Sequence, residues 1–268
     1  MTKAEYAELP VHCLVLLQRV WRKSGCQLQI REYPVLEFDS ELQLAKPGHS
    51  AHTLSYLANY RRHLPHFVVN SCFKILRVWK APAEERYVPA SQVGMTLPEP
   101  YHRELVQKLE LLPQGDREQY AEQTSRFLAG ALARQLTSFP VDLRVEDEIR
   151  RTWPMQEEGQ RAYLKCQVND FLHTLDEGLL RLVPEGVYRA STAMNIAFTV
   201  SAAELVGVSL DPKVRQHCSR GLAEQLLHHL KTISEQGIRG DRLLTDAWAH
   251  ELRLEGWYEW VRLGEAET

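Results

Sequence analysis

The sequence predicts an α+β fold that is mostly α, in which a small N-terminal sheet with helices precedes an all-helical bundle. Apolar and polar residues alternate strictly in 27–31, which is the period of a half-buried strand. From residue 101 to near the end, apolar residues instead recur every three or four positions, as in helices with one buried face. This change of period indicates two structurally different parts.

The composition is that of a folded globular protein. The 268 residues are 44% hydrophobic and 25% charged, a balance that excludes a disordered chain, a collagen-like chain and a coiled-coil rod. This length corresponds to one or two domains, with a core large enough to be stable without disulfides. The 32 Lys and Arg residues against 35 Asp and Glu residues give 32 − 35 = −3, which argues against non-specific nucleic-acid binding over a broad basic surface.

Cysteine usage and the N-terminal residues indicate a cytoplasmic protein. The five cysteines form no C-x-x-C pair and most fall within helical patterns, as expected of free thiols in a reducing compartment. Residues 1–8 carry acids and lack the pattern of a signal peptide. No apolar stretch reaches the roughly 18 residues that a membrane span needs, so we expect no membrane partner.

The N-terminal part alternates between helical and extended patterns. A helix is expected over 4–24, where Gly25 marks its end. A second helix is expected over 66–80, because Pro65 precedes a wide apolar stripe at helical spacing. The prolines of 87–100 predict a surface loop or linker. Between the two helices, extended segments are expected at 27–31, 36–38, 42–44 and 52–57.

The C-terminal part is expected to be a bundle of helices. The middle of 185–206 is apolar nearly all round, which is typical of the buried centre of a bundle. Residues 257–261, three of which are aromatic, are expected to form a short helix or a packed tail. We divide the chain into a small α+β domain over 1–95 and a helical domain over 96–268. Helices are expected at 116–138, 156–182, 185–206, 211–236 and 239–252.

Histidines gather near the predicted sheet and could hold a metal ion. His49, His52, His63 and His66 carry imidazoles, which are preferred zinc ligands, and they suggest a metal-dependent hydrolase. Their spacing matches no ligand pattern, however, and no acid stands in the register of a general base. The alternative is that these histidines are exposed or hydrogen-bonded residues at the ends of elements.

The helix expected after the sheet reads HFVVNSCFKILR from His66. The order of a helix, a small sheet and this helix over about 5–80 resembles the minimal zincin domain of IrrE-type metallopeptidases. In that family the second helix carries H-E-x-x-H, whose histidines bind zinc and whose glutamate activates water. In the best register, Asn70, Ser71 and Lys74 stand where His, Glu and His would stand. An amide and an ammonium cannot hold zinc there, so the resemblance implies a degenerate zincin-like domain kept for binding.

A local set of cations could form a phosphate-binding stripe. Arg61 and Arg62 precede the second helix, and Lys74, Arg77 and Lys80 follow at steps of three residues, so that they share a helix face. Such a stripe could contact the phosphates of a nucleic acid. The alternative is a solvated helix face.

Aromatic residues are concentrated near the C-terminus. Trp248, Trp257, Tyr258 and Trp260 lie within 13 residues. They form either part of the core or a patch on which a protein partner docks. In the same region, Asp246 and His250 stand one helical turn apart and could orient each other.

The leading functional hypothesis is a non-catalytic protein-binding or regulatory protein with a degenerate zincin-like domain. It rests on the missing catalytic residues and on the aromatic cluster, and the sequence has no glycine-rich phosphate loop or nucleophile elbow. The expected partner is another protein, and no cofactor is expected. The alternatives are a zinc-dependent hydrolase that uses the four histidines and a nucleic-acid-binding protein that uses the basic stripe.

Overall fold

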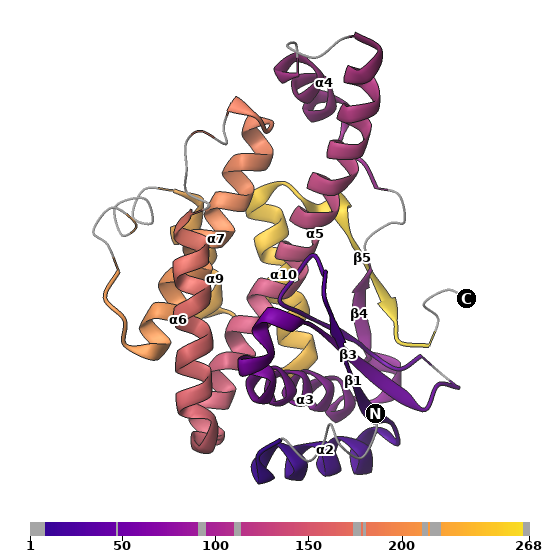
Figure 1. The fold of residues 1–268 in the computed structure, drawn as a ribbon, viewed down its shortest axis with the longest axis vertical. Coiled ribbons are helices and arrows are strands. Elements are labelled where there is room, and N and C mark those ends of the chain that lie inside the picture. Colours follow the sequence, from indigo (N-terminus) through magenta and orange to yellow (C-terminus); the bar gives the residue numbers. More distant parts are fainter. Residues whose placement is uncertain are drawn as a thin grey trace.

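A computed structural model shows a mostly helical α+β protein in which one helix is buried between a small sheet and a helical bundle (Figure 1). The structure describes residues 9–46, 48–90, 95–109, 114–173, 178, 181–210, 214 and 221–264. The fold class predicted from the sequence is confirmed. Among the helices in these ranges, none combines the length and the apolar character that crossing a membrane requires.

The N-terminal sheet has three strands in the order β1-β3-β2. Strand β1 (Gln27–Tyr33) runs parallel to β3 (Ala51–Leu57), whereas β2 (Ser40–Gln43) runs antiparallel to β3. Alternation in β1 buries Leu28 and Ile30, so one sheet face packs against helices and the other stays polar. The strand expected at 36–38 does not form; these residues bend into β2 instead.

Two helices cover the apolar face of the sheet. Helix α2 (Val11–Ser24) ends at Gly25, whose φ of 76° is the left-handed conformation that glycine adopts without strain. It packs against α3 (Leu64–Lys80), which begins with the expected proline in its first turn. Helix α3 is buried on nearly all sides, because α2 and the sheet cover one flank and the bundle covers the other.

The longest helix departs from the prediction that it ends near residue 138. Helix α5 (Gln114–Thr152) continues through Pro140. Proline removes a backbone hydrogen bond from a helix, but apolar residues on both sides of it are buried. Leu136 packs in the core of the bundle, and Val145 and Ile149 pack in the core of the sheet. Packing in two cores therefore outweighs the local preference to end the helix.

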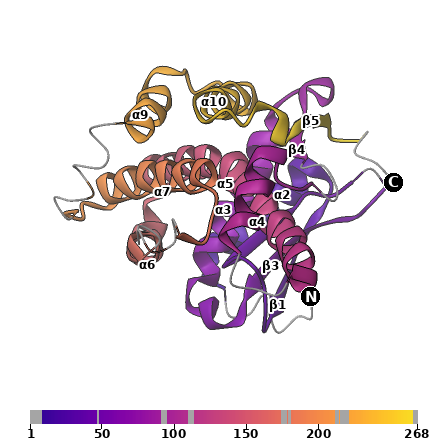
Figure 2. The same ribbon diagram turned by 90° about the horizontal axis from the view of Figure 1, so that it is seen from above.

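The remaining helices form the bundle around α5. Helices α7 and α10 confirm the predictions over 185–206 and 239–252, and parts of the predictions over 156–182 and 211–236 lie outside the described residues. Figure 2 shows α9 and α10 on the far side of α5 from the sheet. Their bounds are α4 (Glu99–Lys108), α6 (Glu157–His173), α7 (Glu185–Val206), α9 (Leu222–Thr232) and α10 (Gly237–Leu252).

A second, two-stranded sheet joins segments far apart in the sequence. Strand β4 (Tyr87–Ala90) lies in the predicted linker and pairs antiparallel with β5 (Glu259–Arg262), which replaces the helix or tail expected at 257–261. This pairing links the parts that the sequence divides near residue 95. The division stays a prediction, but β4, β5 and α5 belong to neither part alone.

A buried ion cluster fastens α3 to the bundle. Arg77 donates from Nε and Nη2 to both oxygens of Asp241 on α10, at 3.0 and 2.7 Å, and its Nη1 binds Glu148 and Glu235. The side chains of Arg77 and Asp241 are only 5% and 7% exposed. Arg144 of α5 binds Asp241 at 3.3 Å. Three helices therefore meet at one bidentate pair of charges.

Replacing Arg77 by Ala is expected to lower the free energy of unfolding by about 3–5 kcal/mol, because it leaves Asp241 buried without its main partner. Urea denaturation measures the change. The control is Arg103→Ala, whose exposed pair with Glu99 should contribute less than about 1 kcal/mol. Equal effects of the two variants would show that the buried cluster does not stabilise the fold.

Candidate functional site

A cavity of about 800 Å³ lies between the N-terminal sheet and the bundle. Every residue from 37 to 44, which includes all of β2, lines one wall. Helices α3, α5 and α6 form the opposite wall, and residues of β4 and β5 close one side. The cavity is therefore built from both parts of the chain.

The polar wall of the cavity is formed where α3 and α5 run side by side. His66 and Asn70 of α3 both reach Glu146 of α5, at 3.0 and 2.7 Å from its Oε1. Lys74, one turn further along α3, forms an ion pair with Asp142, one turn earlier on α5. This crossed order shows that the two helices are antiparallel and that their polar faces are in register.

Glu146 is an anion fixed by several donors. Burial alone would raise the pKa of this carboxyl, but His66 and the amides of Gln160 and Asn70 hold the pKa below its ordinary value. Gln160 donates to Oε2 at 2.6 Å, so both oxygens accept hydrogen bonds. A carboxylate engaged in this way orients α3, α5 and α6, and it is poorly placed to accept a proton from a substrate.

His66 is a buried residue of the cavity wall with one polar atom that is not hydrogen-bonded within the described part of the chain. Its side chain is 1% exposed, and its Nδ1 atom has no hydrogen-bond partner among the described residues. His66 also contacts the ring of Tyr163, with 4.9 Å between ring centroids. A buried polar atom without a partner costs free energy, so the contacts of His66 with Glu146 and Tyr163 have to offset this cost.

The acidic end of the cavity contains Asp39 and Asp170. Gln167 donates a hydrogen bond to Asp39, and the hydroxyl of Tyr60 donates to Asp170 at 3.3 Å. Burial raises the pKa of Asp39, and the neighbouring charge of Asp170 raises it further, although hydrogen bonds from Tyr60, Gln167 and Tyr163 oppose this. This end of the cavity favours cationic or hydrogen-bond-donating groups.

The other walls are apolar and aromatic. Phe139, Phe171 and Phe198 come from three helices and pack with ring centroids 4.8–5.3 Å apart. Trp260 of β5 also lines the cavity. An apolar wall opposite a few polar groups is the common composition of ligand-binding cavities.

The four histidines proposed as metal ligands are not grouped around one site, although His63 and His66 both pack on the ring of Tyr163, at 5.6 and 4.9 Å between ring centroids. The ring of His52 is fully buried, accepts a hydrogen bond from the backbone of Ala45 at 3.0 Å and contacts Ser24. His63 is buried and contacts Arg62, His66 binds Glu146, and His49 is exposed. Within the described residues, no three His, Cys, Asp or Glu side chains are grouped as metal ligands.

Four of the five cations in the predicted basic stripe are paired with carboxylates from other elements. Lys80 binds Glu148 at 3.4 Å, and Arg61 binds Glu32 at 3.5 Å. Lys74 and Arg77 face Asp142 and Asp241, while Arg62 donates to the ring of His63. These acids weaken the positive potential that a phosphate would need, and nucleic-acid binding stays an untested hypothesis.

The four aromatic residues proposed to form a docking patch are divided between core and surface. Trp248 is fully buried and donates a hydrogen bond to the carbonyl of Leu226 at 3.0 Å. Trp257 is 6% exposed. Neither can contact a partner on the surface. Tyr258 and Trp260 are half-buried, and both donate to Oδ1 of Asp246, at 2.6 and 2.7 Å.

Asp246 therefore accepts hydrogen bonds from these two aromatic residues and holds them together. His250, which the sequence pairs with Asp246, contacts Glu255 at 3.0 Å.

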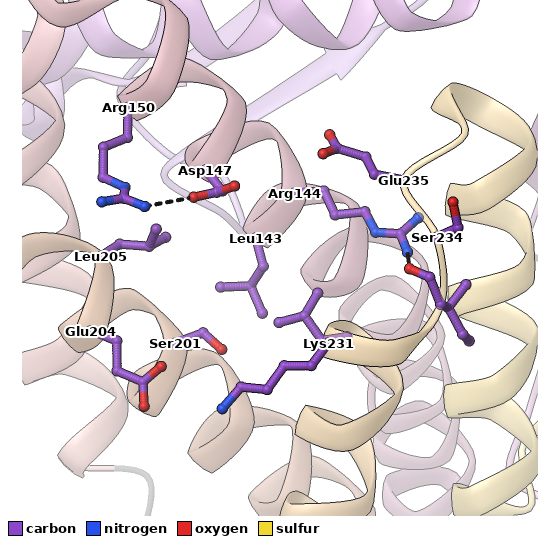
Figure 3. A pocket seen from close by; sticks show the side chains of 12 residues that line it. Leu143, Arg144, Asp147, Arg150, Ser201, Glu204, Leu205, Lys231, Ser234 and Glu235 are labelled. Atoms are coloured by element: carbon purple, nitrogen blue, oxygen red, sulfur yellow. Dashed lines mark hydrogen bonds and ion pairs between the residues drawn. The ribbon is translucent and has the colours of Figure 1, made fainter.

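A second pocket, of about 420 Å³, lies on the other side of α5, between α7 and α9 (Figure 3). Arg150 binds Asp147 at 3.0 Å, and Arg144 binds the carbonyl of Ile233 at 2.7 Å. Charges of both signs line this pocket, so its electrostatics favour no particular class of ligand.

No protein-family model, curated protein or solved structure matches the chain. Neither a family nor an activity is assigned to it by similarity.

Replacing His52 by Asn tests whether this histidine is a structural group. Burial lowers the pKa of His52 from 6.5 to about 4. Between pH 6.5 and pH 4 the imidazole of His52 is therefore protonated in the unfolded chain but stays neutral in the folded chain. This component of stability is complete above pH 6.5 and is lost as pH falls toward 4.

At pH 5 the loss amounts to about 2 kcal/mol. Urea denaturation at pH 7 and pH 5 should show this pH-dependent component in the natural protein but not in His52→Asn. If the difference in the free energy of unfolding between the two proteins were the same at both pH values, the assignment of His52 as a buried neutral imidazole would be refuted.

Proposed function

We propose that the protein is a non-catalytic protein-binding protein that accepts an extended segment of another protein in the cavity beside β2. The free edge of β2 is the observation that carries this proposal. A cytoplasmic location fits the free thiols of the four described cysteines.

Strand β2 offers backbone hydrogen-bonding groups to the cavity. In the sheet, Leu57 donates to the carbonyl of Asp39 at 2.9 Å, and the register pairs Ser40 with Tyr56. Hydrogen bonds alternate along an antiparallel pair, so the N–H and C=O groups of Ser40 and Leu42 point away from β3. Among the described strands, none pairs with that edge of β2.

The exposed edge favours a polypeptide over a small molecule. A volume of about 800 Å³ is within the range of small-molecule sites, but the free strand edge adds a row of main-chain donors and acceptors that an extended peptide can satisfy. A peptide that adds a strand forms main-chain hydrogen bonds with the edge and places alternate side chains into adjacent pockets. Here the aromatic wall and the acidic end supply two such pockets.

The zincin-like interpretation of the N-terminal part belongs to the same proposal. Asn70 and Lys74, which stand at the two histidine positions of the zincin register, both face carboxylates of α5. A helix with two side chains one turn apart opposite a carboxylate is a common arrangement of zinc ligands. Here Lys74 and Asp142 form an ion pair inside this arrangement, which supports a domain retained for binding.

Ser40→Pro tests the binding mode, because it removes an outward N–H without removing a hydrogen bond of the sheet. A photo-crosslinker at exposed Gln43 is introduced into the protein in its native host. We expect a crosslinked partner whose yield falls about two- to tenfold in Ser40→Pro, the effect of one lost hydrogen bond. Ser40→Ala keeps the N–H and is the control. Equal yields from both variants would contradict strand addition.

Asn70→His/Lys74→His tests the zincin-like arrangement. The two imidazoles and a carboxylate of α5 should bind one zinc ion per chain, measured by elemental analysis after dialysis. Asn70→Ala/Lys74→Ala is the metal-free control. A folded double-histidine variant without zinc would refute the arrangement. Stoichiometric zinc in the natural protein would instead support the metal-dependent hydrolase.

A further inference from the structure

Helix α2 has an apolar face without a described partner. Its inner face is fully buried through Cys13, Leu16 and Val20. Its outer face exposes four large hydrophobic side chains: Val11 at 76%, Leu14 at 38%, Val15 at 51% and Trp21 at 53%. Single exposed hydrophobic residues are common, but four on one face of a 14-residue helix mark an interaction surface.

The exposed residues follow the spacing of a helix–helix contact. Leu14 and Val15 follow Val11 by three and four residues, and Gln18 and Trp21 continue at further steps of three. These side chains therefore form one stripe along the helix. A stripe of this period fits the ridges of a second helix. The surface is therefore shaped for a helix.

The charged side chains of α2 all have the same sign. The segment Val11–Ser24 contains no Asp or Glu, and its cations Arg19, Arg22 and Lys23 are all exposed. Within the ranges that the structure describes, none of the three has an ion-pair partner, although the chain as a whole has a formal net charge of −3. The surface therefore complements a negatively charged partner.

We propose that the outer face of α2 binds an amphipathic α-helix of another protein, with an apolar stripe flanked by acidic residues. The stripe would pack on Val11, Leu14 and Val15, and the acids would pair with Arg19, Arg22 and Lys23. A second copy of α2 is a poor partner, because like charges would meet. Sedimentation with anionic vesicles distinguishes this partner from a membrane surface.

This surface is separate from the cavity. Helix α3 lies between them, because Asn70 and Lys74 line the cavity while α2 packs on another side of α3. Figure 1 shows α2 at the periphery of the molecule, beyond α3. The protein can therefore hold a helix on α2 and an extended segment in the cavity at the same time, which would make it an adaptor between two partners.

Two labelled synthetic peptides of about 20 residues test the proposal. Both are designed as amphipathic helices with a leucine stripe, one flanked by Glu and the other by Lys. Fluorescence anisotropy with the full chain is expected to show saturable binding of the Glu peptide, at least about tenfold tighter than the Lys peptide and weakened by salt.

Variants of α2 connect this binding to the proposed face. The charge variant Arg19→Glu/Arg22→Glu/Lys23→Glu should reverse the preference between the peptides. The apolar variant Val11→Ser/Val15→Ser should lower the affinity for the Glu peptide at least about tenfold. The control Arg103→Glu/Arg126→Glu changes exposed cations on other helices and should leave both affinities unchanged. Circular dichroism confirms that each variant is folded.

Three results would overturn the proposal. The first is equal affinity for the two peptides, or no reversal in the charge variant. The second is sedimentation of the protein with phosphatidylserine vesicles that the charge variant abolishes, which would assign the face to a membrane. The third is a dimer that Val11→Ser/Val15→Ser dissociates. Crosslinking at Gln43 reports on the cavity independently, so either proposal can fail without the other.

Discussion

The pairing of Arg77 with Asp241 is the interaction on which the arrangement of the molecule depends. Each charge is almost completely removed from water, and each would be costly there alone. The pair forms only when α3 and α10 are in their final positions, and Glu148, Glu235 and Arg144 add partners from α5 and the turn before α10. It therefore selects one orientation of the sheet relative to the bundle, which apolar packing alone would specify less strictly.

Local pattern predicts much of this fold. The alternation in 27–31 and the stripe in 66–80 depend on one buried face, and both elements form where expected. The extension of α5 through Pro140 and the pairing of β4 with β5 were not predicted. Both depend on packing between segments that are distant in the sequence. The hydrophobic period of a single segment does not report such contacts.

The site was predicted in its residues more than in its chemistry. His66, Lys74 and Arg77 were singled out, but as metal or phosphate ligands, because Glu146, Asp142 and Asp241 stand about 70 or more residues away in the sequence. Asp142 and Glu146 are spaced by one helical turn, a signal that was missed because the helix was expected to end before them. Burial likewise decided the roles of Trp248 and His52, which residue type alone does not reveal.

The pairing of β4 with β5 has a consequence for the order of events during synthesis. Strand β4 lies about one third of the way along the chain, yet its partner is translated some 170 residues later. Until then β4 has an unsatisfied edge, and the side of the cavity that Trp260 completes is open. Ligand capture should therefore begin only after β5 has left the ribosome, so that the site matures long after β4 has been synthesised.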